Sequence, residues 1–107
     1  MKDEFSENLL NIIKSKKEGD AKISYTALLH KKGLSEILNK IAEEAEETIN
    51  AAKFEGDEAL IHEVADLWFH CLVLLSNKNL TVNDITNELK SRQGISGIEE
   101  KNNRERS

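Results

Sequence analysis

The chain has 107 residues, of which 38% are hydrophobic and 33% are charged, and its formal net charge is −5 at pH 7. This length suits one small domain, so we expect residues 1–107 to form a single unit. Proline is absent and glycine occurs five times, which argues against an all-β fold with many turns. The acidic balance argues against nucleic-acid binding, which normally uses a basic face.

Membrane and secreted classes are also disfavoured by the sequence. The longest apolar stretches are too short to cross a bilayer, and the polar, acidic N-terminus lacks the pattern of a secretory signal. The single cysteine, Cys71, cannot form an internal disulfide, and no CxxC pair is present for zinc or redox chemistry. We therefore expect a cytoplasmic protein without a membrane partner.

The first half of the chain predicts three helices. Apolar residues at helical spacing indicate a first helix over 3–17 and a short helical segment over 24–29 that ends at Gly33. Ser35 offers an N-cap for a long helix over about 35–55.

The second half predicts two more helices. Asp57 offers an N-cap for a helix over about 57–76. Thr81 and Asp84 have the spacing of a capping box, which opens a last helix that reaches about Arg92.

Together these elements predict an all-α fold, a bundle of four or five helices. The two central helices, separated by few residues, are expected to pack as an antiparallel hairpin. From about residue 93 the tail is polar, and we expect it to be flexible until a ligand or partner orders it.

The second central helix is unusually apolar. From Glu63 to Leu75 it reads EVADLWFHCLVLL, in which ten of 13 residues are apolar and lie on all sides. A helix of this kind is normally enclosed by other helices, and a small monomer has little material to enclose it. We therefore expect a homodimer that packs these helices together; a monomer that exposes this surface is the alternative.

The polar residues of this helix form one stripe. Glu63, Asp66 and His70 fall within a sector of about 60° on a wheel of about 100° per residue. Carboxylates on a buried helix need partners, because an unpaired charge away from water is costly. His70 is either part of the site or a core histidine bonded to a backbone carbonyl or a carboxylate.

The preceding helix carries a matching stripe. Lys40, Glu44 and Glu47 line it, Glu43 lies beside them, and Glu46 points outward. If the two helices form a hairpin, the acidic residues of the two stripes converge.

Four converging carboxylates would need a cation. Glu44, Glu47, Glu63 and Asp66 would repel one another, and their pKa values would rise until a cation neutralised them. Carboxylate oxygens suit Mg²⁺, with Mn²⁺ as a substitute, better than Zn²⁺. Mg²⁺ held by few carboxylates usually binds substrate phosphates, so the pattern indicates a phosphate-processing site. Runs such as EEAEE also occur on solvated helix faces, and that alternative stays open.

Four segments in order narrow the interpretation. They are SYTALLHKKG at 24–33, KIAEEAEETINAA at 40–52, EVADLWFHCLVLL at 63–75 and ELKSRQGISGIEEK at 88–101. This series resembles the phosphoribosyl-ATP pyrophosphohydrolase family, within the all-α nucleoside triphosphate pyrophosphohydrolases that include MazG-like enzymes. The resemblance implies Mg²⁺-dependent hydrolysis of phosphoribosyl-ATP to phosphoribosyl-AMP and pyrophosphate, the second step of histidine biosynthesis.

The resemblance also implies roles for single residues. The metal ligands would be Glu44, Glu47, Glu63 and Asp66. The residues matched to substrate binding are Lys40, Ser24, Tyr25, Thr26 and His70. Glu43 and Glu47 are our candidates to position or deprotonate the attacking water. Other roles are open for three of these residues: Lys40 could pair with Glu44, Tyr25 could be a packed aromatic, and Ser24 could cap a helical turn.

Two other functions remain possible at this point. A MazG-like enzyme that hydrolyses other nucleoside triphosphates would use the same four acids. A non-catalytic helical interaction protein would explain the apolar helix but not the single polar stripe on it.

Overall fold

The computed structural model describes residues 4–22 and 24–93. This part of the chain is helical and contains no strand, which confirms the predicted all-α class. The helices are α1 (Glu4–Ser15), α2 (Tyr25–Lys32), α3 (Leu34–Phe54), α4 (Asp57–Asn77) and α5 (Val82–Lys90). The flexible tail was expected from about residue 93, and its residues after Gln93 lie outside the described residues.

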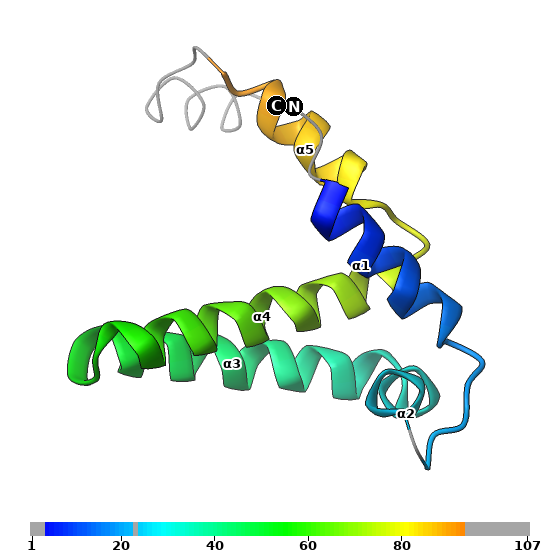
Figure 1. Ribbon diagram of the computed structural model, residues 1–107, viewed down its shortest axis with the longest axis horizontal. Coiled ribbons are helices and arrows are strands. Elements are labelled where there is room, and N and C mark those ends of the chain that lie inside the picture. The colour runs from blue at the N-terminus through cyan, green and yellow to red at the C-terminus, as the bar shows by residue number, and fades with distance from the viewer. Residues whose placement is uncertain (1–3, 23, 94–107) are drawn as a thin grey trace.

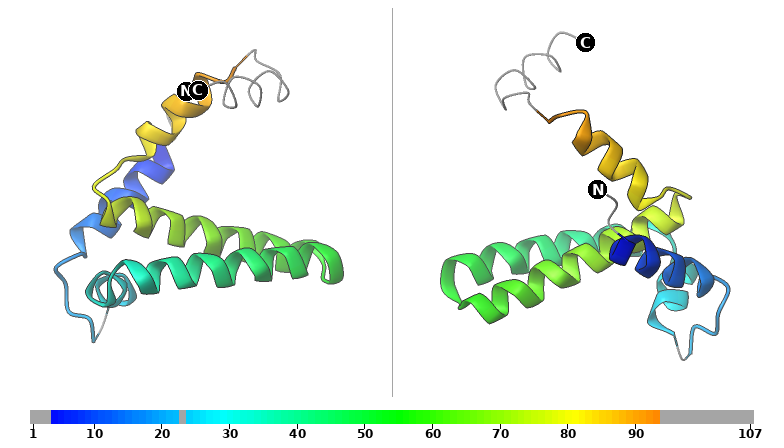
Figure 2. Two further views of the ribbon diagram at one scale, coloured as in Figure 1. Left: turned by 180° about the vertical axis from the view of Figure 1, so that it is seen from behind. Right: turned by 45° about the horizontal axis from the view of Figure 1, so that its top comes forward.

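Helices α3 and α4 form the long antiparallel hairpin that the short connection predicted (Figure 1). Glu55 and Gly56 alone join them, and the backbone N–H of Glu55 donates to the carbonyl of Ala51 to close α3. Helix α2 packs near the start of α3, and α1 contacts α4 and α5, which Figure 2 shows from two further directions. The hairpin thus projects well beyond the other three helices.

The helix starts are partly as predicted. At α5 the Thr81 side chain accepts from the Asp84 backbone, and Asp84 accepts from the Thr81 backbone, so the capping box is confirmed. Ser35 and Asp57 were wrong as N-caps, because α3 and α4 start one residue after Gly33 and Gly56, respectively, and neither has a side-chain cap bond.

The physical reason at α3 is the sharp turn from α2. Gly33 has φ of 90°, in a region that L side chains disfavour and glycine adopts freely. A glycine at the junction takes the capping position, and Ser35 is displaced into the first turn of the helix.

The buried core lies at one end of the hairpin. It combines residues of α1, α2, α3, the C-terminal half of α4 and the start of α5: Leu10, Ile13, Leu29, Ile37, Leu72, Val73, Leu75 and Val82. The projecting part of the hairpin takes little share in this core. Its arrangement therefore depends on contacts between α3 and α4 themselves.

Large apolar side chains remain exposed along the hairpin. On α4, Ile61 is 68% exposed, Val64 48% and Trp68 37%, and on α3 Ile49 is 54% exposed. The apolar side chains in the first half of α4 are thus left partly open in this single chain, whereas Leu72, Val73 and Leu75 of the second half are buried. By length and composition α4 also reaches what a membrane span requires, although soluble core helices reach it too.

Candidate metal centre

Three of the four predicted acids meet between α3 and α4. Glu44, Glu47 and Glu63 can each offer one carboxylate oxygen such that all three oxygens lie within 4.8 Å of one another. Glu44 and Glu47 are three residues apart, which places them on one face of α3. The hairpin brings that face against the Glu63 side of α4. This arrangement can hold a divalent cation.

Two carboxylate oxygens in this cluster are left without partners. Oε2 of Glu44 and Oε2 of Glu63 are buried, and neither has a hydrogen-bond partner in the described part of the chain. A buried oxygen with a negative charge and no donor costs free energy. Hard oxygen donors that lack protein partners are what Mg²⁺ or Mn²⁺ would satisfy, so the donor set fits such an ion.

The electrostatics of the cluster also favour a cation. Burial raises the pKa of the Glu44 carboxyl, and the negative charges of Glu47 and Asp66 raise it further. The pKa of Glu47 is raised by Glu63, whose carboxyl is close enough to share a proton with it and also repels it as a charge. Both carboxyls therefore hold protons more tightly than usual, and a bound cation would favour their ionised forms.

Asp66, the fourth predicted ligand, is turned toward another side chain. Its Oδ2 lies 3.2 Å from Nε2 of His62, one turn earlier on α4. His62, Glu63 and Asp66 form a second group of donor atoms within 4.8 Å of one another. Glu63 thus belongs to both groups. Sequence reasoning missed His62, although its spacing of four residues from Asp66 was a usable signal.

Lys40 lies on α3, as Glu44 and Glu47 do, and it pairs with a carboxylate on each side. Its Nζ is 3.4 Å from Oε2 of Glu43 and 4.0 Å from Oε1 of Glu36. The ion pairs of Lys40 are therefore with Glu36 and Glu43, not with Glu44 as one interpretation of the spacing suggested. The charge and hydrogen bond of Glu43 raise the pKa of Lys40, which keeps it cationic.

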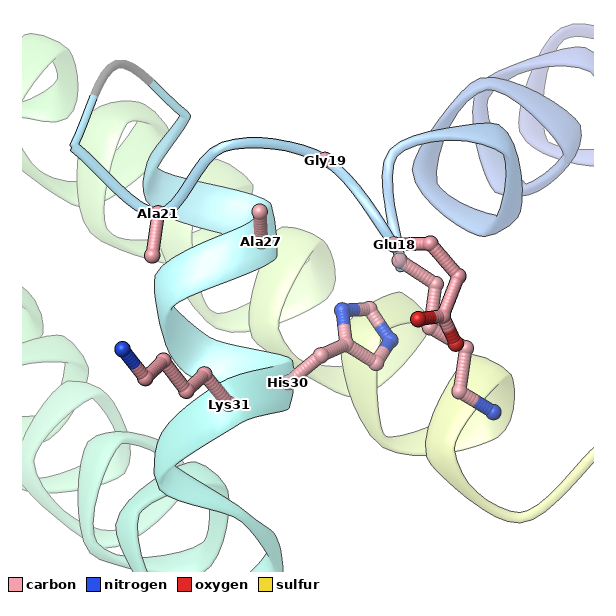
Figure 3. Close-up of a pocket in the computed structure, with 7 residues that line it drawn as sticks. Glu18, Gly19, Ala21, Ala27, His30 and Lys31 are labelled. Atoms are coloured by element: carbon pink, nitrogen blue, oxygen red, sulfur yellow. The ribbon is translucent and has the colours of Figure 1, made fainter.

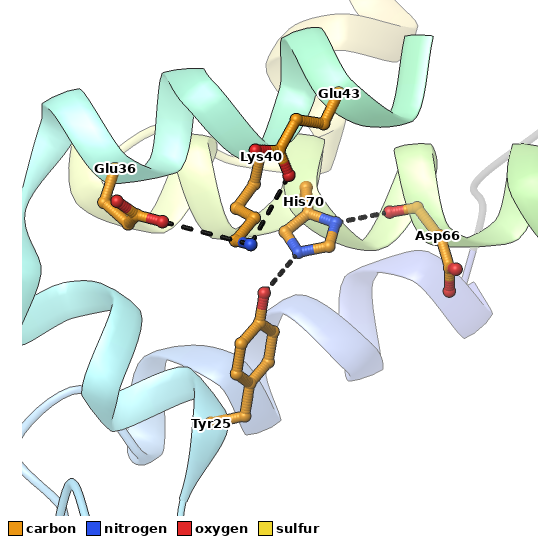
Figure 4. A network of polar contacts seen from close by, with 6 residues as sticks. All are labelled: Tyr25, Glu36, Lys40, Glu43, Asp66 and His70. Carbon is orange, nitrogen blue, oxygen red and sulfur yellow. Dashed lines mark hydrogen bonds and ion pairs between the residues drawn. The ribbon is translucent and has the colours of Figure 1, made fainter. Parts of the chain in front are cut away.

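Tyr25 and His70 connect α2 to the ligand-bearing part of α4 (Figure 4). The Tyr25 hydroxyl lies 2.9 Å from Nε2 of His70, and Nδ1 of His70 lies 2.8 Å from the backbone carbonyl oxygen of Asp66. His70 is 6% exposed, whereas Tyr25 is 47% exposed. The structure thus brings both residues beside the acidic cluster, and Tyr25 presents the more open surface.

Ser24 and Thr26 have evident local partners. The Ser24 hydroxyl accepts from the backbone N–H of Ala27 at 3.2 Å and caps α2. Thr26 is buried, and its carbonyl oxygen lies 2.8 Å from Nδ1 of His30. Ser24 thus has a structural role at the start of α2, and Thr26 contributes its buried position and a backbone acceptor.

A cavity of about 320 Å³ lies elsewhere, beneath the segment that leads into α2 (Figure 3). Charges of both signs line it, and none of the predicted site residues does so. Its lining consists of Lys17, Glu18, Gly19, Ala21, Ala27, His30 and Lys31. The acidic cluster therefore remains the candidate site.

Comparison with known proteins gives a consistent result. A profile of the family described as phosphoribosyl-ATP pyrophosphohydrolase matches residues 6–93. A protein named phosphoribosyl-ATP pyrophosphatase from Hydrogenovibrio crunogenus is 50% identical, over 87% of this chain and 86% of that protein. Proteins of the same name from Vesicomyosocius okutanii and Ruthia magnifica are 48% and 50% identical; they match 95% and 87% of this chain and are themselves covered over 97% and 89% of their lengths.

Proposed function

The chain belongs to the phosphoribosyl-ATP pyrophosphohydrolase family, and from this we propose both its reaction and its metal. It is a hydrolase that acts on phosphoribosyl-ATP, which confirms the expectation of an enzyme over a non-catalytic helical protein. The proposed reaction breaks the bond between the α- and β-phosphates and yields phosphoribosyl-AMP and pyrophosphate. We assign it to the second step of histidine biosynthesis.

The proposed cofactor is Mg²⁺, with Mn²⁺ as a substitute. The observation that carries this proposal is the meeting of Glu44, Glu47 and Glu63, with two buried oxygens that lack partners in the described residues. Asp66 would complete the ligand set after its carboxylate leaves His62. When bound, the ion neutralises phosphate charge and orients the scissile bond.

Two carboxylates are candidates to position the attacking water. Glu43 already pairs with Lys40 at 3.4 Å, and this ion pair offsets much of the negative charge of Glu43. Glu47 faces the Glu63 carboxyl instead and is the stronger candidate. A carboxylate at this place can accept a proton from water as the water attacks phosphorus.

Lys40 is the proposed phosphate contact. Its ammonium lies between the carboxylates of Glu36 and Glu43, one helical turn before Glu44 on α3. A phosphate group of the substrate would compete with these two carboxylates for the Lys40 ammonium. Tyr25 is near enough to Lys40 for the positive charge to oppose the rise that burial gives to the Tyr25 pKa.

We also propose that the chain works as a homodimer in the cytoplasm. The support is the set of exposed apolar side chains on the projecting hairpin, among them Ile49, Ile61 and Val64. A second copy would cover this surface, and the same surface explains why α4 is apolar on nearly all sides. A membrane would be a poor partner, because Glu63 and Asp66 stand in the middle of α4.

The decisive experiment measures pyrophosphate release from phosphoribosyl-ATP, with ATP, dCTP and dUTP as parallel substrates, in Mg²⁺ and in EDTA. We expect turnover of phosphoribosyl-ATP alone, and loss of that turnover in EDTA. Turnover of the ordinary nucleotides instead would assign the chain to a MazG-like specificity. Undiminished turnover in EDTA would overturn the proposed metal.

A further inference from the structure

The hydrogen bonds of His70 define the direction of a short chain of donors. The Asp66 carbonyl oxygen can only accept, so Nδ1 of His70 carries the proton that it donates at 2.8 Å. In the neutral ring, Nε2 is then an acceptor, and the Tyr25 hydroxyl donates to it at 2.9 Å. Each polar atom of His70 therefore has a partner within the protein.

Aromatic packing holds the same pair in place. The rings of Tyr25 and Phe69 are stacked, with centroids 6.4 Å apart and 20° between their planes. His70 meets both rings edge-on, at 5.8 Å from Tyr25 and 5.5 Å from Phe69. Three rings and one hydrogen bond thus fix where the Tyr25 hydroxyl lies relative to α4.

Exposure separates the roles of the two residues. His70 is 6% exposed and cannot reach a ligand without leaving the core, whereas Tyr25 is 47% exposed. Through its bond to His70, the Tyr25 hydroxyl lies one turn along α4 from Asp66, and the charges of Lys40 and Glu44 are near enough to affect its pKa. A bound substrate would meet Tyr25 and not His70.

We propose that His70 is a positioning residue that holds the Tyr25 hydroxyl at the substrate site, rather than a substrate contact itself. The inference rests on the proposed function and deepens it, because it states that Tyr25 contacts the substrate and that His70 contacts Tyr25. Because Tyr25 donates its proton to His70, the hydroxyl oxygen is left as an acceptor. It therefore suits a hydrogen-bond donor of the substrate, and the phosphates fall to the metal site and Lys40.

Two substitutions of His70 separate its two hydrogen bonds. An asparagine amide reaches the position of Nδ1, so His70→Asn keeps the bond to the Asp66 carbonyl and loses Tyr25. A glutamine amide reaches the position of Nε2, so His70→Gln can still accept from Tyr25. We expect His70→Asn and Tyr25→Phe each to lower kcat/KM for phosphoribosyl-ATP by about 3- to 10-fold, the usual value of one hydrogen bond. His70→Gln should retain most of the activity.

A double-mutant cycle provides the test. In the Tyr25→Phe background, His70→Asn should cost no further activity, because its effect passes through Tyr25. An undiminished cost in that background would overturn the proposal and make His70 an independent contact. Inhibition by pyrophosphate with Mg²⁺ should be unchanged in both single variants, because the phosphates bind to the metal site and Lys40. Weaker inhibition in either variant would mean that Tyr25 or His70 also contacts the phosphates, and would overturn this assignment.

A second measurement does not depend on turnover. Tyr25 is the one tyrosine of the chain, so incorporated 3-fluorotyrosine gives a single ¹⁹F resonance. His70→Asn should move this resonance toward that of free fluorotyrosine, and His70→Gln should move it less. An unmoved resonance in folded His70→Asn protein would overturn the positioning role. If the wild type does not hydrolyse phosphoribosyl-ATP, the proposed function fails, and the resonance still decides the link between His70 and Tyr25.

His30 offers a matched control for these variants. It has the same local bond, from Nδ1 to the carbonyl oxygen of Thr26 four residues earlier, but its Nε2 faces the hydroxyl of Ser76 at 2.9 Å. His30→Asn should reduce thermal stability and leave the Tyr25 resonance in place. An equal shift in both asparagine variants would indicate a general loosening and would count against the proposal.

Discussion

Glu44 on α3 and Glu63 on α4 face each other across the helical hairpin, and each keeps a buried carboxylate oxygen that has no hydrogen-bond partner among the described residues. Two ionised carboxylates in this position repel each other and lose hydration. This pair of carboxylates therefore lowers the free energy of unfolding of the metal-free protein. This relationship underlies the first two predictions.

Glu63→Gln should abolish metal-dependent hydrolysis while the fold persists. Glu63 contributes to both groups of donor atoms, and even residues around a metal site typically change affinity or activity by about 10- to 100-fold. We expect a loss of at least about 100-fold in kcat/KM. Mg²⁺ should raise the thermal midpoint of the wild type and not that of the variant.

Glu46→Gln is the control for this substitution, because Glu46 is exposed on the same acidic run of α3. It should keep wild-type activity and the Mg²⁺-dependent rise in midpoint. Activity near the wild-type level in Glu63→Gln would remove Glu63 from the proposed ligand set.

Glu44→Gln should stabilise the metal-free protein at neutral pH. The pKa of Glu44 is raised above its ordinary value of 4.5 by burial and neighbouring charges, so the folded state binds this proton more tightly than the unfolded state. The unfavourable contribution is absent below the ordinary pKa, grows as pH rises toward the folded pKa, and persists at neutral pH. Because Glu44 as a whole is only partly buried and solvent screens its charge, we expect a modest gain of about 1–4 °C in midpoint near pH 7.

Thermal unfolding in EDTA checks this expectation. The difference between Glu44→Gln and wild type should shrink toward zero near pH 4, whereas Glu46→Gln should show no such change with pH. A variant that is less stable than wild type near pH 7 would mean that the Glu44 charge is favourably paired.

Val64→Asp should dissociate the proposed dimer. Val64 is 48% exposed on α4 beside Ile61, and a carboxylate buried there against a second copy would have no partner. We expect the dimer dissociation constant to rise by at least about thirtyfold, as measured by sedimentation velocity. Asn50→Asp places the same group at an exposed polar position of α3 and should leave the dimer intact. A wild-type protein that sediments as a monomer would contradict the proposal.

Ser24→Ala should lower stability, and Ser35→Ala should not. Ser24 caps α2 through its bond with the Ala27 backbone, and loss of such a cap costs about 1 kcal/mol. Ser35 lies past the N-cap of α3 and has no capping bond there. Chemical denaturation of both variants measures the difference. Equal losses would mean that the serine hydroxyls act through something other than capping.

The sequence predicted the helices and the acidic stripes well, because both depend on spacing along one helix. The long hairpin follows from two periodic segments with a two-residue connection, and α5 follows from the capping box at Thr81. The caps at Ser35 and Asp57 failed because Gly33 and Gly56 occupy the junctions. Turn geometry between helices is a tertiary property, which a capping pattern read from one helix does not contain.

Two side-chain arrangements at the site could not be predicted from the sequence, for a similar reason. Spacing put Asp66 with Glu63, but the rotation of the Asp66 side chain toward His62 depends on local electrostatics. The burial of His70 beneath Tyr25 depends on how α2 packs against α4. Neither can be obtained from the periodicity of a single helix.

The two-residue connection between α3 and α4 also bears on how fast the site is assembled during folding. Glu44, Glu47, Glu63 and Asp66 all lie within one hairpin, so their approach needs only a short loop closure. Helical topologies dominated by such local contacts fold in microseconds to milliseconds. The donor atoms can therefore meet before the more distant α1 and α5 dock, and a divalent ion present at that stage would favour the folding hairpin.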